Sequence, residues 1–105
     1  MFTIPNELTA YYTSGKSLVC DIDMQPWECE FWPLEELEIY NHEYEVHMYA
    51  SGYLGFATSG GGEMYAISPS GKVVCLAFIG MSPSEELFIA ESWSEFENML
   101  RNAVQ

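Results

Sequence analysis

The fold is decided by residues 52–79, which read GYLGFATSGGGEMYAISPSGKVVCLAFI. Its apolar segments are 53–57, 63–67 and 72–79. The turn between the first two, 58–62, contains consecutive glycines, and glycine freely adopts positive φ angles. The second turn, 68–71, has proline early and glycine late, as hairpin turns prefer. This spacing predicts three consecutive antiparallel strands, and the almost continuously apolar last strand should be buried on both faces.

The segment that follows predicts a helix packed on this sheet. Ser92-Trp93-Ser94-Glu95 form a capping box, in which Ser92 accepts from the Glu95 amide while the Glu95 side chain reaches back. An apolar stripe of helical spacing follows, made of Trp93, Phe96, Leu100 and Ala103. Such a stripe should cover one face of a sheet. Before it, residues 82–85 resemble a shorter helix start and residues 87–90 predict an edge strand.

The N-terminal half predicts a helix, two strands and a second helical segment. Pro5 is favoured as the first residue of a helix over 5–12. Alternating apolar residues predict strands over 18–24 and 27–32, and apolar spacing predicts helical turns over 34–40. The pattern over 41–51 is ambiguous. We therefore expect an α+β fold, with a mainly antiparallel sheet of about five to six strands and N-terminal and C-terminal helices packed on it.

Charge and composition exclude several classes of protein. The chain has 105 residues, 16 acidic and 3 basic, and a formal net charge of −13. Proteins that bind nucleic acid or anionic lipid need a basic patch, so both classes are excluded. The chain has no apolar run long enough for a membrane helix and no signal-peptide pattern, and its cysteines suit buried thiols in a reducing compartment. We expect one folded domain over 1–105 in the cytoplasm.

The glycine turn and the final helix are similar to the signature of the SUKH superfamily. The matching residues are Gly60, Gly61, Gly62, Glu63 and Tyr65, then Ser92, Trp93 and Phe96. The resemblance implies an α+β domain that lacks the first helix with which members usually begin. It also implies a protein without catalysis. Bacterial members are frequently immunity proteins that bind and block toxins, many of them nucleases, and fungal members are regulatory or scaffold domains in cell-wall signalling.

Sites other than a protein interface have little support in the sequence. A phosphate loop leads into a helix and usually carries lysine, whereas the glycines here lead into a strand that starts with Glu63. We expect the Glu63 carboxylate to accept hydrogen bonds from turn amides instead. The five-residue offset of His42 and His47 suits neither face of a helix nor of a strand, which argues against a metal site. No nucleophile motif is present, so we expect no catalytic residue and no cofactor.

An acidic span is the strongest signal in the residues themselves. Between Lys16 and Lys72 there are ten acidic residues and no Lys or Arg. A solvated face is one explanation, and a basic partner that is attracted by this charge is another. The candidate partner contacts are Glu28, Glu30, Trp32, Glu35, Glu36, Glu38, Glu43 and Glu45. Trp27, Tyr44 and Tyr49 lie in the same span, and an exposed aromatic residue among carboxylates would be an anchor.

These observations predict an intracellular immunity protein. It would neutralise a toxin by covering a basic groove, and a nuclease is the toxin class that the acidic span favours. The alternative is a non-catalytic regulatory or scaffold module that binds a cellular protein. Both functions stay open at this point, as does the oligomeric state.

Overall fold

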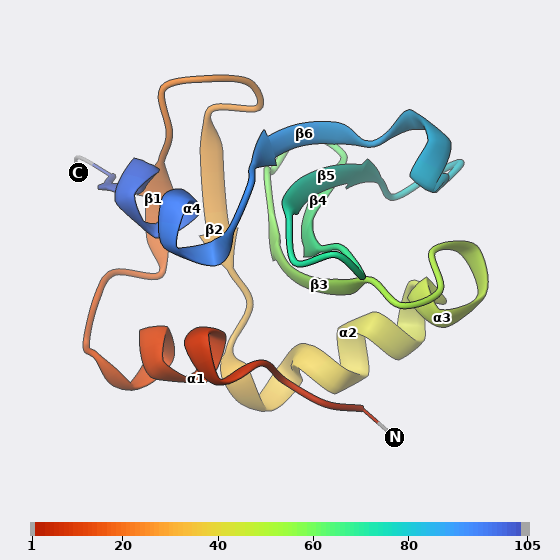
Figure 1. The fold of residues 1–105 in the computed structure, drawn as a ribbon, viewed down its shortest axis with the longest axis horizontal. Coiled ribbons are helices and arrows are strands. Elements are labelled where there is room, and N and C mark those ends of the chain that lie inside the picture. Colours follow the sequence, from red (N-terminus) through yellow and green to blue (C-terminus); the bar gives the residue numbers. More distant parts are fainter. Residues whose placement is uncertain (1, 104–105) are drawn as a thin grey trace.

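The computed structural model describes residues 2–103 and folds them around one antiparallel sheet (Figure 1). Its seven strands lie in the order β6-β5-β4-β3-β2-β1-β7. They are β1 (Val19–Asp21), β2 (Glu28–Phe31), β3 (Leu54–Thr58), β4 (Glu63–Ile67), β5 (Val73–Ala77), β6 (Leu87–Ala90) and β7 (Arg101–Asn102). The helices are α1 (Asn6–Thr13), α2 (Leu37–Glu43), α3 (Val46–Tyr49) and α4 (Trp93–Met99), and the short 3-10 turns are η1 (Leu34–Glu36) and η2 (Pro83–Glu85). The α+β prediction is confirmed, with a larger sheet than expected.

The predicted meander is confirmed as β3, β4 and β5. The glycine turn forms because Gly60 and Gly62 take φ angles of 79° and 100°, which side chains rarely adopt. β5 is buried from Val73 to Leu76, as its continuous apolar sequence predicts. The expected edge strand is also confirmed, since β6 pairs with β5 and ends the sheet.

The N-terminal strands β1 and β2 pair as a hairpin. β2 is shorter than the predicted strand over 27–32, because its first and last residues lie outside it. Cys29 and Phe31 point inward and Glu28 and Glu30 outward, as predicted. Trp27, however, has a left-handed φ of 73° and is 55% exposed. Trp32, one of the candidate partner contacts, lies at the other end of the expected strand. β2 ends at Phe31, and the next residue, Trp32, is only 8% exposed.

The last helix is shorter than its sequence stripe predicts. Ser92 caps α4 as expected, accepting from the Glu95 amide at 3.1 Å, while the Glu95 carboxylate accepts from the Glu91 amide at 3.0 Å. The helix ends at Met99, and Leu100 is extended. The next residues pair with β1 as β7, so Ala103 belongs to no helical stripe. Residues 101–102 can either extend α4 or pair with the open edge of β1, and in the structure they pair with β1.

Aromatic residues of α1 and α4 fill the core on one face of the sheet. Tyr11 of α1 stacks on Phe31 of β2 with ring centroids 4.7 Å apart. Trp93 and Phe96 of α4 pack edge-on against Phe56 of β3 at 5.4 and 5.7 Å. The family-motif residues Trp93 and Phe96 are therefore core residues, which sets α4 against the centre of the sheet.

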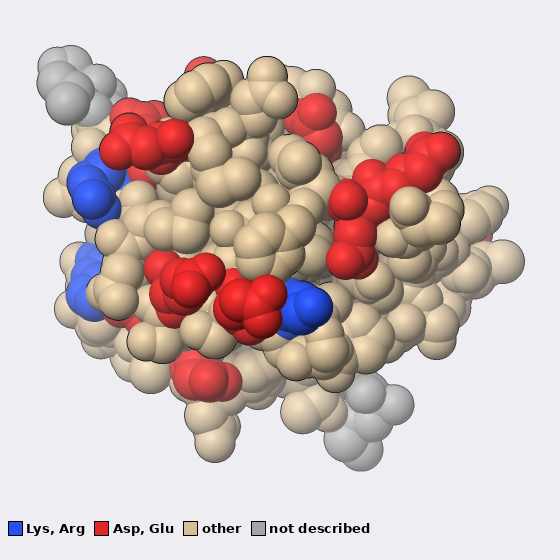
Figure 2. All heavy atoms as spheres, turned by 45° about the horizontal axis from the view of Figure 1, so that its top comes forward, with Lys and Arg blue, Asp and Glu red and all other residues tan. Residues whose placement is uncertain are grey.

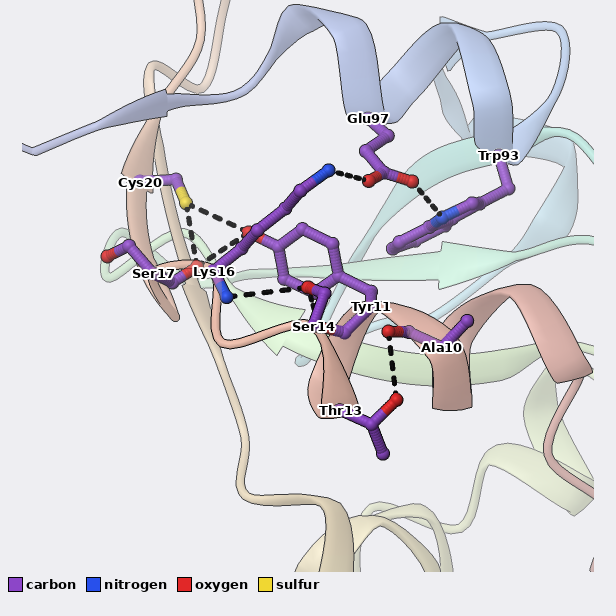
Figure 3. Close-up of polar contacts among 9 residues, drawn as sticks. All are labelled: Ala10, Tyr11, Thr13, Ser14, Lys16, Ser17, Cys20, Trp93 and Glu97. Atoms are coloured by element: carbon purple, nitrogen blue, oxygen red, sulfur yellow. Dashed lines mark hydrogen bonds and ion pairs between the residues drawn. The ribbon is translucent and has the colours of Figure 1, made fainter.

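Polar contacts around Lys16 tie α1 to α4 (Figure 3). Lys16 forms an ion pair with Glu97, and the second oxygen of that carboxylate accepts from Trp93 Nε1 at 3.1 Å. The Tyr11 hydroxyl donates to the Ser17 carbonyl at 2.6 Å. The cation at the N-terminal boundary of the acidic span is thus engaged within the fold.

Candidate functional site

The structure distributes the acidic span over separate parts of the surface. Glu28 and Glu30 lie on the exposed side of β2, opposite Asp21 and Val19 of β1. The other predicted contacts, Glu35, Glu36, Glu38, Glu43 and Glu45, lie on η1, on α2 and in the α2–α3 turn. Figure 1 places the β1–β2 hairpin and α3 at opposite ends of the molecule, and Figure 2 shows carboxylates in separate groups on one face. The predicted acidic contacts therefore do not form one patch.

Two of the predicted acidic contacts, Glu43 and Glu45, line a groove together with aromatic side chains. The groove lies between the α2–α3 turn and the β5–η2 loop and has a volume of about 590 Å³. We call it the aromatic groove, and its lining residues are Glu43, Tyr44, Glu45, Tyr49, Phe78, Gly80 and Met81. Carboxylates and exposed rings from the acidic span come together in this groove.

The wall formed by α2 and α3 depends on the backbone of Glu45. This residue takes the left-handed conformation, φ 57° and ψ 40°, and separates the two helices. Its carbonyl accepts from the amides of Met48 and Tyr49 at 3.0 and 3.1 Å, which starts α3. The sharp turn thereby places Glu43, Tyr44 and Tyr49 along the same groove, although the sequence over 41–51 is ambiguous.

The floor of the aromatic groove is a stack of rings. Tyr44 packs on Phe78 with ring centroids 4.4 Å apart, and Trp32 lies parallel to Tyr44 at 6.0 Å. Tyr44 is 39% exposed and Tyr49 54% exposed, in contrast to the buried Trp32. Trp32 therefore supports the floor, and the accessible rings are those of the two tyrosines.

Two exposed apolar residues are sequence neighbours of residues that line the groove. Met48 of α3 is 63% exposed and Ile79, which follows β5, is 93% exposed. Phe78, Ile79, Met48 and Met81 were not predicted as site residues. A signal was present, because Phe78 and Ile79 extend an apolar strand directly into a glycine turn, where polar residues are expected.

Two hydrogen-bonded contacts hold the elements around the groove in place. The buried Asn41 side chain of α2 pairs with both backbone groups of Gly55 in β3, donating to its carbonyl and accepting from its amide, each at 2.8 Å. The Tyr53 hydroxyl donates to Glu86 at 2.6 Å, and this bond raises the pKa of Tyr53 to about 12. Asn41 thus fixes α2 on the sheet, and Tyr53 joins the segment after α3 to the segment after η2.

The glycine hairpin has a structural network of its own, which differs in detail from the prediction. The Glu63 carboxylate accepts from the Ser59 hydroxyl at 2.8 Å rather than from turn amides. Ser59 Oγ in turn accepts from the amides of Gly61 and Glu63, at 3.0 and 3.3 Å. Tyr65 donates to the Glu28 carbonyl at 2.7 Å and so links β4 to the start of β2. These motif residues therefore hold the hairpin together.

His42 and His47 lie together, contrary to the expectation from their spacing. Their exposed rings are parallel within 3° and 6.0 Å apart, because the turn at Glu45 brings the two helices side by side. Across residues 2–103, however, no group of three or more His, Cys, Asp or Glu side chains is placed to hold a metal ion. Within the same range, no helix is long and apolar enough to cross a membrane.

The cysteines are buried, and none forms a disulfide within the part of the chain that is described. Burial raises the pKa of the Cys75 thiol to about 12 and raises that of Cys29 well above its ordinary value. A thiol attacks as the thiolate, so both groups stay unreactive at neutral pH.

Comparison with models of protein families identifies the family of this chain. No curated protein matches the chain. The model of the SMI1 / KNR4 family (SUKH-1) matches residues 1–99, a range that includes the glycine hairpin, the aromatic groove and α4. This chain belongs to the SMI1/KNR4 (SUKH-1) family.

Proposed function

We propose that this protein is an immunity protein that binds a cognate toxin and neutralises it by covering a basic groove, and that the toxin is a nuclease. The observation that carries the proposal is the aromatic groove, where Tyr44 and Tyr49 are exposed beside Glu43 and Glu45. The family supports a role in protein binding, since SUKH proteins include immunity proteins and are generally non-catalytic. The protein then neutralises the toxin by occupying its basic groove, in the cytoplasm where the toxin acts.

Charge supports a basic partner. A nuclease holds phosphates with Lys and Arg, so its substrate groove is positive. A chain of net charge −13 is attracted to such a groove over distances of about a Debye length, roughly 8 Å at physiological salt. Exposed aromatic side chains then supply the buried contacts from which most binding energy comes. The aromatic groove combines both features.

Co-purification with any toxin domain that is encoded beside this chain tests the proposal. We expect the complex to form, the nuclease activity to fall in proportion to the amount bound, and the association rate to drop as salt is added. Tyr49→Ala should weaken the complex, and Phe88→Ala, which truncates a ring that is 45% exposed on β6, is the matched control. A neighbouring toxin that is neither bound nor inhibited would refute the proposal and favour a regulatory or scaffold module.

A further inference from the structure

We propose that the aromatic groove receives an arginine side chain of the partner, an inference that rests on the proposed function and specifies the chemistry of its contact. The groove presents two kinds of group to a ligand, ring surfaces and carboxylates, and its lining comes from two separate segments, 43–49 and 78–81. Its volume of about 590 Å³ accommodates a long side chain together with part of the backbone that carries it.

The rings form a surface on which a flat cation can stack. Tyr44 and Phe78 lie 4.4 Å apart with an interplanar angle of 35°, and the parallel Trp32 supports Tyr44 from the core. Tyr49 is more exposed than Tyr44 and adds a second accessible ring. Aromatic faces attract cations, and the planar guanidinium group of arginine also stacks on them.

The carboxylates at the groove are available to a partner. Among residues 2–103, the side chains of Glu43 and Glu45 form no hydrogen bond with another protein group. The ion pair within this range joins Lys16 to Glu97, away from the groove lining. Glu43 and Glu45 line the same groove as Tyr44, so a cation on that ring has carboxylates nearby. A guanidinium group can pair with a carboxylate through two parallel hydrogen bonds, whereas an ammonium group acts as a point charge.

Glu45 has a left-handed backbone conformation that glutamate rarely adopts. Glycine or asparagine suits a left-handed φ of 57°, and glutamate does not. Residues that break a local rule are expected at functional or strained sites. A carboxylate at the edge of an arginine-binding groove explains its presence at this turn.

Titration with short peptides tests this inference without the toxin. The ¹⁵N-labelled protein is titrated with acetyl-Gly-Arg-Gly-amide and with the same peptide carrying citrulline or lysine in place of arginine. We expect the arginine peptide to shift the amide signals of Tyr44, Glu45 and Tyr49. Citrulline has the same shape without the charge, so its affinity should be at least about tenfold lower. Lysine should bind more weakly than arginine.

Variants show whether the shifts arise in the groove. Glu45→Asn should weaken binding of the arginine peptide, and Glu91→Asn, an equal change of charge at an exposed position near α4, should not. Absent shifts in the groove, or equal shifts with citrulline or lysine, would overturn the inference. A toxin that is bound and neutralised equally by the wild type and by Glu45→Asn would also overturn it, while the proposed function would stand.

Discussion

Replacing Glu45 with asparagine is expected to stabilise the fold while it weakens partner binding. A left-handed conformation costs a residue other than glycine or asparagine about 1–2 kcal/mol. The backbone of Glu45 has this conformation, and its carbonyl starts α3, so the cost is present in the folded state. Asparagine tolerates these angles and removes one negative charge. We expect the free energy of unfolding to rise by about 1 kcal/mol, which corresponds to about 4 °C in a domain of this size.

Three substitutions at this position separate backbone strain from charge. Glycine relieves the strain but loses more conformational entropy on folding, by about 0.5–1 kcal/mol, so its gain should be smaller than that of asparagine. Alanine removes the charge and leaves the strain. Urea unfolding followed by tryptophan fluorescence should therefore rank the variants Asn, Gly and then Ala. An alanine variant as stable as the asparagine variant would show that charge, not the backbone, sets the effect and would refute the reasoning.

Three further predictions concern the surroundings of the groove and the second acidic surface. Asn41→Leu leaves both backbone groups of its β3 partner unpaired and should cost about 2–5 kcal/mol in urea unfolding. Tyr53→Phe removes the bond to Glu86 and should cost about 1 kcal/mol at neutral pH. The pKa of Tyr53 is raised from about 10 in the unfolded chain to about 12 in the folded protein. The bond to Glu86 therefore contributes its full stabilisation below pH 10 and loses it as the pH rises through 12. The Tyr53→Phe variant should accordingly lose less free energy of unfolding at alkaline pH than the wild type. Changing Glu28 and Glu30 to lysine should slow association in stopped-flow measurements and flatten its salt dependence.

The meander could be predicted because its signals are local. The strand lengths and turns of 52–79 depend on glycine, proline and continuous apolar runs, and each of these acts within a few residues. The Ser92 cap of α4 is equally local, and it accepts from the Glu95 amide as expected. The SUKH resemblance uses the same residues, and the family match over 1–99 confirms it.

The remaining features depend on contacts between distant segments. The helical stripe continues to Ala103, but pairing of β7 with β1 ends the helix at Met99, and that partner lies about eighty residues away. The turn at Glu45 carries no glycine or asparagine to reveal it. The groove itself needs Tyr44 and Phe78 side by side, and nothing in either segment alone indicates the other. The sequence therefore indicates which carboxylates belong to the acidic span but not the shape of the groove that some of them line.

In the proposed complex, the separate acidic groups should have different effects on binding. Attraction over a Debye length depends on the total charge, so the carboxylates on β2 contribute to it although they lie far from α3. Residence in the complex depends on contacts that exclude water, and the aromatic groove, with Tyr44 and Tyr49 exposed beside carboxylates, offers such contacts. Changes on β2 should then act on the association rate and changes in the groove on the dissociation rate. An acidic protein that binds through a defined site would show this division, whereas one that binds by charge alone would respond equally to the loss of any carboxylate.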